Sequence, residues 1–382
     1  MERAVISNFS ISSELLIESL IFDSPKCLIH TNYLEINEEF GRHHLRDLYI
    51  ARHQTIPEIR LHRVPGGVNL AVHGDEDFVL YLGDRALAEQ IRPYWTDDDV
   101  AATITQAAGR TEVSEEAILV ARFGLRTWGH WLGELLPKVV CVERAYPGRF
   151  RYVVPASIVT DVNLRTMRQS LDAYGIGRDR LLFVHAGRTY RFANLFAVSP
   201  VWFPLCPLHP HVVNLMRTII PPPDQIVRRP KSVALLRRES TTRNLANVEE
   251  VCTYLQSRGW SIVDVALLDF LDQVTVFASA ENIISVLGSG LTGLMYSPEG
   301  AKVVTLAPGN WGDLFFFSLM QERQVRLADI RGLSLAEEPA GARLLPFVLG
   351  VADLDSGLRA LGLSVDPISS MRMARTLSGS RG

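Results

Sequence analysis

Val233-Ala-Leu-Leu-Arg-Arg238 and Ile283-Ile-Ser-Val-Leu287 are the two apolar runs that decide the fold of the second half of this chain. The first run ends in two arginines, and the second continues directly into the glycine-rich turn Gly288-Ser-Gly-Leu-Thr-Gly293. Short apolar runs with such borders are typical of buried strands in a parallel sheet. We expect both runs to end side by side at the carboxyl edge of one sheet. Arginines and bare backbone N–H groups would then form a cradle for a diphosphate.

The chain after residue 230 alternates between strand and helix patterns. Its predicted strands are residues 232–238, 261–265, 282–287 and 302–306, and its predicted helices are residues 247–258, 269–280 and 314–323. Asn247 and Glu250 have the spacing of a capping box, and Gly259 stands just past the end of the first helix. Regular alternation of this kind predicts a parallel, doubly wound α/β sheet.

Residues 117–184 show a similar alternation and predict a second α/β domain. The predicted strands are residues 117–123, 152–154 and 181–184, and the predicted helices are residues 129–146 and 161–174. Pro137 predicts a kink in the first helix, because proline lacks the N–H that a helix interior uses. Asp161 or Thr160 would cap the second helix, and Gly175 would end it.

The proline-rich segment 221–230 is the predicted linker, because consecutive prolines form a stiff, extended spacer. We expect an N-terminal domain over residues 1–220, with a mixed, β-rich subregion at residues 1–110 that includes strands 67–72 and 78–82. The predicted nucleotide-sugar-binding domain covers residues 231–335. Residues 336–382 form a tail with one strand (344–349), one helix (353–361) and a frayed end.

The composition excludes several classes of protein. Hydrophobic residues make up 47% of the 382 residues and charged residues 21%, which argues for a soluble globular protein and against disorder. The net charge of -3 gives no reason to expect binding to nucleic acid. The cysteines show no metal-binding spacing, and no signal peptide is visible. We expect a cytoplasmic protein, and peripheral contact with the inner face of a membrane stays open.

The turn Gly288–Gly293 also fits G-x-G-x-x-G, the signature of dinucleotide binding. A dehydrogenase would need an acidic residue about 20 positions later, at the end of the next strand. That strand ends in Thr305-Leu-Ala-Pro308 without a carboxylate, which argues against NAD. An oxidoreductase that uses NAD or modifies a nucleotide-sugar is the first alternative function. The competing structural interpretation is that the glycines serve helix–strand packing alone.

Two sets of polar residues are candidates for chemistry. Arg237 and Arg238 point to opposite sides of a strand, so one of them, together with Arg243, would face a phosphate; a solvated strand end is the competing interpretation. His130 and Glu134 stand four residues apart on one helix face and could supply a general base for a sugar hydroxyl. The competing interpretation is a structural His–Glu hydrogen bond, and the pattern is not the HExxH of a zinc site.

The ordered set of these motifs resembles glycosyltransferase family 61. The segments that carry the resemblance, which runs roughly from Ala117 to Arg323, are Gly129-His-Trp-Leu-Gly-Glu-Leu-Leu-Pro137, Leu235–Glu250, Gly259-Trp-Ser-Ile-Val263, Asp272-Gln-Val-Thr-Val-Phe277, Leu287–Gly293 and Pro298–Leu306. The resemblance implies a GT-B architecture, in which two Rossmann-like domains face a cleft. It also implies inverting transfer from a nucleotide-sugar, with a UDP-sugar as first choice, and no metal or other cofactor. The partners would be that donor and a glycan or lipid-linked glycan acceptor in capsule, exopolysaccharide or related cell-surface polysaccharide synthesis.

The resemblance also assigns roles to individual residues. Contacts to the nucleotide-sugar are expected from Arg237, Arg238, Arg243, the backbone of Gly288, Ser289, Gly290 and Leu291, and the hydroxyl of Thr292. Glu299 is a further candidate for a contact with the ribose or uracil, and the favoured competing interpretation is a surface turn residue. Glu134 is the first choice for the general base, with His130 as its orienting partner or substitute. Stacking on the acceptor sugar is expected from Trp128, Trp131 and Trp202, with core packing as the competing interpretation.

Two positions depart from the family pattern. Leu287 stands where the family has a histidine before the glycine turn, and Gly293 stands where it has an asparagine. The arginines and the amides of the turn would then have to neutralise the diphosphate without that histidine. These departures support a second alternative function, a catalytically degenerate partner protein with a transferase fold.

Overall fold

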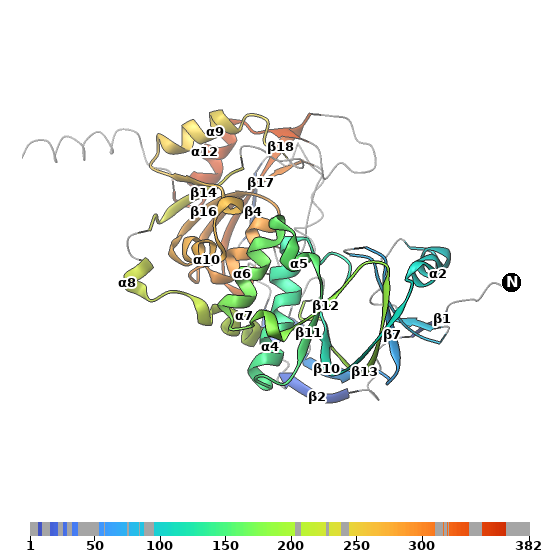
Figure 1. Ribbon diagram of the computed structural model, residues 1–382. Coiled ribbons are helices and arrows are strands. Elements are labelled where there is room, and N and C mark those ends of the chain that lie inside the picture. Colours follow the sequence, from blue (N-terminus) through green and yellow to red (C-terminus); the bar gives the residue numbers. More distant parts are fainter. Residues whose placement is uncertain are drawn as a thin grey trace, which may run out of the picture. The chain divides into compact units, whose positions relative to one another are not determined.

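The computed structural model describes residues 7–9, 16–21, 26–28, 33–36, 53–56, 58–74, 76–83, 85–87, 95–202, 208–226, 229–237, 244–309, 316, 319, 321–335 and 346–363. The chain divides into two compact units (Figure 1). Unit 1 comprises Met1–Lys26, Thr55–Ile219 and Asp269–Leu271, and unit 2 comprises Cys27–Gln54, Ile220–Leu268 and Asp272–Gly382. Each unit contains its own sheet with helices, so the predicted α/β class is confirmed.

The sheet of unit 1 joins an antiparallel half to a parallel half. Its strands run in the order β1 (Ser7–Phe9), β9 (Arg85–Leu87), β8 (Phe78–Leu82), β7 (Val68–Val72), β13 (Arg188–Val198), β10 (Arg110–Leu119), β11 (Arg151–Pro155) and β12 (Leu181–Val184), with β6 (Ile59–Arg63) on β13 and β2 (Leu16–Ile21) on β6. β13 pairs antiparallel with β7 and parallel with β10, and thereby joins the two halves. β3 (Lys26–Leu28) and β5 (His53–Thr55) form a separate small sheet.

The helices of unit 1 lie beside both halves of its sheet (Figure 1). They are α2 (Asp97–Gln106), α3 (Trp128–His130), η4 (Trp131–Leu135), α4 (Leu136–Ala145), α5 (Ser157–Thr160), η5 (Val162–Leu164), α6 (Arg165–Ala173), η6 (Arg178–Arg180), α7 (Pro210–Met216) and η7 (Arg217–Ile219). Val100 of α2 packs on the antiparallel half, against Ala71, Val79 and Ala86. Asp161 caps η5 through its carboxylate, and Gly175 closes the end of α6 with φ of 75°, both as predicted.

The predicted kink at Pro137 takes another form. The turn before it, η4, is a π-helical turn in which the N–H of Leu136 reaches back five residues to the carbonyl of Trp131. An α-helical path would set the Pro137 ring against the carbonyl of Gly133, and the wider turn avoids that clash. Helix 128–145 therefore continues through the proline with one widened turn.

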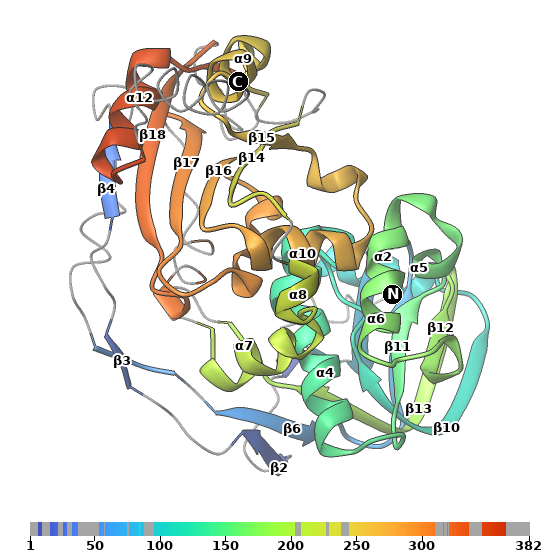
Figure 2. The same cartoon turned by 90° about the vertical axis from the view of Figure 1, so that its left-hand side faces the viewer.

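The sheet of unit 2 is mainly parallel. Its strands run in the order β15 (Ser261–Val263), β14 (Ser232–Leu235), β16 (Asn282–Val286), β17 (Lys302–Pro308) and β18 (Arg326–Ser334), side by side in Figure 2. β18 also pairs with β4 (Tyr33–Ile36) and, antiparallel, with β19 (Phe347–Val348). The pairing with β4 explains why Cys27–Gln54 groups with unit 2, although the sequence assigns it to the N-terminal domain.

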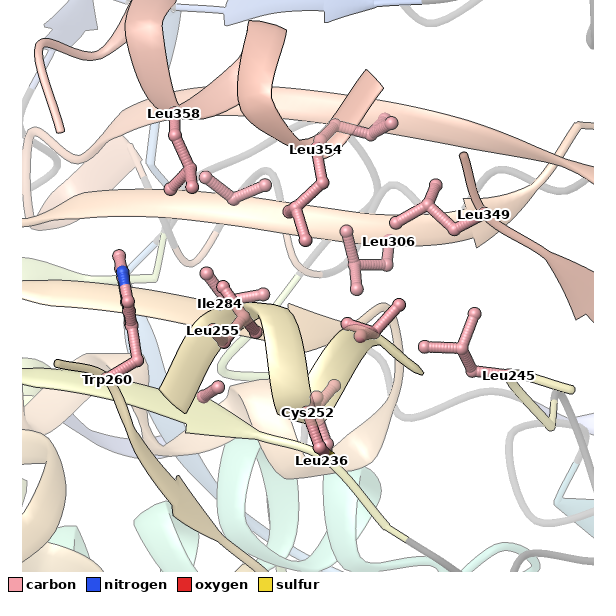
Figure 3. Packing of buried hydrophobic residues seen from close by; sticks show 14 of the residues in the cluster. Leu236, Leu245, Cys252, Leu255, Trp260, Ile284, Leu306, Leu349, Leu354 and Leu358 are labelled. Atoms are coloured by element: carbon pink, nitrogen blue, oxygen red, sulfur yellow. The ribbon is translucent and has the colours of Figure 1, made fainter. Parts of the chain in front are cut away.

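The helices of unit 2 are α8 (Pro223–Ile226), α9 (Val248–Gln256), η8 (Val265–Leu267), α10 (Phe270–Ser279), whose first two residues belong to unit 1, η9 (Ser289–Tyr296) and α12 (Val351–Ala360). Figure 3 shows one face of the sheet packed under α9 and α12, where Leu255 and Leu354 join Ile284 and Leu306 in a buried cluster. Alternate residues of the strands supply this cluster, as the pleat of a sheet requires.

Several predictions in unit 2 need correction. Asn247 forms no capping box, because its amide donates to the carbonyl of Leu349 at 2.8 Å and to Glu250 at 2.9 Å. Residues 223–226 of the proline-rich segment form a helical turn, since proline fits the first position of a helix. β18 was not predicted. The predicted helix 314–323 and the tail after residue 363 lie partly or wholly outside the described residues.

Candidate active site

The carboxyl edge of unit 2 brings the two deciding segments together. β14 and β16 pair in parallel, with Leu235 opposite Ser285, so Arg237 and the glycine turn leave adjacent strands at the same edge. This confirms the predicted juxtaposition. β15, the next strand along the chain, lies on one side of β14, and the later strands β16, β17 and β18 lie on the other side. The order of strands therefore reverses between β14 and β16, which is where open α/β sheets bind their ligands.

The glycine turn starts a 3₁₀ helix rather than an α-helix. Gly288 precedes η9, and the N–H of Leu291 donates to the carbonyl of Gly288 at 2.8 Å. The predicted contact from the Leu291 amide therefore fails, because that N–H closes the first turn. Ser289 and Gly290 come before this first bond, so their N–H groups point out of the helix start. Arg237 is exposed, whereas Arg238 and Arg243 lie outside the described residues.

Thr292 stands three residues after Ser289, and residues at this spacing share a face of a 3₁₀ helix. Its side chain is fully buried, and its Oγ1 has no hydrogen-bond partner among the described residues. A buried hydroxyl without a partner costs about 1–3 kcal/mol. The hydroxyl is thus a polar group that the described part of the fold leaves unsatisfied beneath the turn.

The two departures from the family pattern have structural explanations. Leu287 is fully buried, and its N–H donates to the carbonyl of Leu306. A Cβ on Gly293 would lie 2.1 Å from a ring carbon of Phe277 in α10, so a larger residue cannot fit without movement of that ring. Both positions pack the interior of unit 2.

Glu299 lies at the opposite edge of this sheet from the glycine turn. It precedes β17, whose first residue Lys302 pairs with Asn282, the first residue of β16. A strand of this length separates the two edges by roughly 16 Å at ~3.3 Å per residue. This exposed position fits the interpretation of Glu299 as a surface turn residue and argues against its contact with a nucleotide on the turn, so we leave Glu299 out of the donor site.

Unit 1 has a second candidate site at the carboxyl edge of its parallel strands. β11 and β12 extend the sheet to one side of β10, and β13 lies on the other, so the order reverses between β10 and β13. Arg122 follows β10 shortly before the helix that carries His130 and Glu134, and the half-buried Trp202 follows β13. This is again the position at which α/β sheets hold ligands.

Arg122, His130 and Glu134 form one ion-paired cluster. Arg122 Nη1 lies 3.2 Å from Glu134 Oε2, and His130 Nδ1 lies 2.5 Å from Glu134 Oε1. Burial alone would raise the pKa of Glu134, but the hydrogen bond from His130 and the charge of Arg122 outweigh it and lower that pKa. Glu134 is therefore ionised, and both of its oxygens are engaged.

The exposed fraction of the side chains separates their roles. The Glu134 side chain is 10% exposed, whereas the His130 side chain is 44% exposed. Because Nδ1 of His130 donates to the carboxylate, its Nε2 is the atom that can accept a proton. The geometry thus favours His130 as the base and Glu134 as the group that orients it, the reverse of the first choice from sequence.

Lys138 lies one turn beyond Glu134 on the same helix. Burial and the positive charge of Arg122 lower its pKa, Glu134 opposes both effects, and the net result is a pKa of about 8. The sequence analysis missed Arg122 and Lys138. Their signals were the position of Arg122 directly after a strand and the four-residue spacing of Glu134 and Lys138.

The three tryptophans lie in different surroundings. Trp131 is fully buried, and its indole N–H donates to Ser170 Oγ at 2.8 Å, so its ring offers no face to a sugar. The competing interpretation, a core aromatic, fits Trp131. Trp128 and Trp202 are half-buried and stay candidates for contact with an acceptor.

Polar side chains gathered where the strand order reverses are typical of α/β enzymes that bind their ligands at this edge. Residues 128–304 match the family model described as Glycosyltransferase 61, from the helix of His130 and Glu134 through the glycine turn into β17. These residues are similar to family 61, and the match shows a glycosyltransferase. The match favours neither the oxidoreductase nor the degenerate partner protein.

No curated protein matches the chain. Among the described residues, no helix is both long enough and apolar enough to cross a membrane.

Proposed function

We propose that this glycosyltransferase moves a sugar, with inversion and without a metal, from a nucleotide-sugar to a glycan or lipid-linked glycan acceptor. A UDP-sugar is the first candidate donor, and synthesis of a cell-surface polysaccharide such as a capsule or exopolysaccharide is the proposed context. The observation that carries the proposal is the pairing of β14 with β16, which sets Arg237 beside the glycine turn. We also propose a GT-B arrangement of the two units and a cytoplasmic location, with peripheral contact at the inner face of the membrane.

The donor diphosphate would bind at the carboxyl edge of unit 2. The N–H groups of Ser289 and Gly290 would donate to its oxygens, and Arg237 would neutralise charge as the diphosphate leaves. Arg238 and Arg243 are proposed as further cations of this site, and the Thr292 hydroxyl is proposed as a polar contact. Guanidinium groups suit this task because they match phosphate oxygens with paired donors and stay charged.

The acceptor would react at the cluster of unit 1. His130 Nε2 takes the proton of the acceptor hydroxyl as that oxygen bonds to the anomeric carbon of the sugar. The bond from this carbon to the phosphate oxygen breaks, and its electron pair leaves with the nucleoside diphosphate. Glu134 stabilises the imidazolium that forms, in the way a buried carboxylate supports histidine in other enzymes. One displacement inverts the configuration at the anomeric carbon.

A binding screen tests the donor site. Thermal unfolding would be followed with UDP, GDP, CMP and NAD, with and without EDTA, in the wild type and in Arg237→Ala. Arg229→Ala serves as the control, since Arg229 is an exposed arginine of the same unit, 3.2 Å from Asp272. We expect stabilisation by UDP that EDTA leaves unchanged, that Arg237→Ala removes and that Arg229→Ala keeps. Stabilisation by NAD alone, or by no nucleotide, would contradict the proposal.

A further inference from the structure

The cluster in unit 1 holds more positive than negative charge. Arg122 and Lys138 both act on Glu134, and among the described residues Arg122, at 3.2 Å, is the permanent cation that forms an ion pair with this carboxylate. Lys138 makes no hydrogen bond or ion pair with a described residue, whereas Lys231 in unit 2 lies 3.0 Å from Glu281. Arg122 and Lys138 thus carry two positive charges against the single negative charge of Glu134.

A surplus cation in a half-buried place is unfavourable unless an anion joins it. Arg122 repels the charged amine of Lys138 and so helps to lower its pKa, which is an effect of the excess positive charge. Arg122 has a side chain that is 29% exposed, and His130 beside it is 44% exposed, so the cluster is open to a ligand on the side of the imidazole. An anionic group bound there would pair with both cations.

We propose that Arg122 and Lys138 form a subsite for an anionic group, a carboxylate or a phosphate, on the acceptor. This inference rests on the proposed function, in which His130 deprotonates the acceptor hydroxyl. His130, Glu134 and Lys138 are four residues apart along one helix, and we take the anionic group to be part of the molecule whose hydroxyl His130 deprotonates. The acceptor is thus an acidic sugar, such as a uronic acid, or a phosphate-bearing glycan.

The low number of lysines makes a direct test practical. The chain contains four, Lys26, Lys138, Lys231 and Lys302, so protein labelled with 13C-lysine gives few Cε–Hε signals in an NMR spectrum. The signal of Lys138 is the one that Lys138→Arg removes. The full chain would be titrated with methyl glucuronide, inorganic phosphate, methyl glucoside and UDP, and the midpoint pH of each lysine signal would be followed.

We expect methyl glucuronide or phosphate to move the Lys138 signal and to raise its midpoint above about 8, because a bound anion favours the charged amine. The carboxylate and phosphate probes separate the two kinds of acceptor. Arg122→Lys should keep this response, Arg122→Met should weaken binding about tenfold or more, and Arg144→Met, which removes an exposed arginine of the same helix, should leave it unchanged.

The inference would be overturned if the Lys138 signal responded to neither anion, or if it responded equally to the neutral methyl glucoside. A response to UDP alone would also overturn it, because Arg122 and Lys138 would then bind the donor and not the acceptor. The measurement does not depend on sugar transfer. A protein that binds UDP but no acceptor anion would refute this inference alone, and one that binds the anion but no nucleotide would refute the proposed donor site alone.

Discussion

At the scale of single residues, the division of labour between Glu134 and His130 follows from their surroundings. Glu134 is nearly buried, and its two oxygens are engaged by His130 and Arg122. A carboxylate held in this way is a weak base, because both the hydrogen bond and the positive charge stabilise its ionised form. The more exposed imidazole keeps one nitrogen available for a proton. Helical spacing alone could not distinguish these two roles.

Substitutions at the two positions should separate base from orienting group. His130→Ala removes the proton acceptor and should lower kcat by roughly 10²–10⁴-fold. Glu134→Gln keeps a hydrogen-bond acceptor for Nδ1 but removes the charge that stabilises the imidazolium, so its loss of kcat should be smaller, with little change in donor KM. The measurement is release of UDP from a panel of UDP-sugars, once the binding screen has shown that the protein binds UDP. A larger loss in Glu134→Gln than in His130→Ala would return the role of base to Glu134.

Lys138 predicts a pH dependence of stability. The pKa of Lys138 is about 8 in the folded chain, and its ordinary value, which applies to the unfolded chain, is 10.5. Between these two values the unfolded chain binds more protons than the folded one. Stability should therefore rise with pH in this window. Lys138→Met removes the buried charge and should be more stable than wild type at pH 7, with a difference that shrinks toward pH 9. Urea unfolding at several pH values measures this, and a difference independent of pH would contradict the assignment.

At the scale of elements, helix 128–145 and the turn before it position the proposed catalytic pair, His130 and Glu134. The π-helical turn η4 carries Glu134, and π turns of this kind are frequent at functional sites. Gly124, in the turn after β10, has φ of 83°, and a Cβ there would lie 3.0 Å from Cδ2 of His130. The glycine therefore permits both the turn and the position of the imidazole.

Gly124→Ala should lose both stability and activity. A side chain at positive φ costs about 1–2 kcal/mol, and the new methyl group would also push the His130 ring. Gly175→Ala is the matched control, since Gly175 has φ of 75° with no atom within 4 Å of the added Cβ. We expect similar losses of unfolding free energy in both variants, but a fall in kcat only in Gly124→Ala. Equal activities of the two variants would show that this contact does not position His130.

At the scale of the whole molecule, a buried polar network stabilises the sheet of unit 2. Asp329 and Arg331 of β18 are fully buried. The carboxylate of Asp329 accepts hydrogen bonds from Arg331 Nε at 2.7 Å and from Thr305 Oγ1 of β17 at 2.6 Å. Loss of one partner leaves a buried charge without compensation. The network ties two neighbouring strands below the carboxyl edge that holds the glycine turn.

Arg331→Met and Asp329→Leu should each destabilise the protein by about 3–5 kcal/mol, whereas the double variant should lose much less than their sum. Urea unfolding of the four proteins in the cycle gives the coupling energy. Additive losses would mean that the two side chains do not act as a pair.

Much of the fold could be predicted from local patterns. The strands of β7, β8 and β12, the helix ends at Gly175 and Gly259, and the alternation in unit 2 follow from side-chain periodicity and turn residues, which act over a few neighbours. β13 and β18 were missed. β13 is stabilised by pairing with β7 and β10, and β18 by pairing with β17 and β4. A local sequence pattern does not show which distant strands will pair.

The sequence by itself determined the α/β class, the glycine turn beside an arginine-bearing strand, and the resemblance to family 61, because these depend on residue order and short spacing. The tertiary structure decided which groups surround each candidate. It placed Glu299 at the far edge of its sheet, buried Trp131 on Ser170, and used the Leu291 amide within its own turn. It also added Arg122 and Lys138 to Glu134. Burial, ion pairing and the resulting pKa shifts depend on atoms brought together from different elements, and those distances exist only in the folded chain.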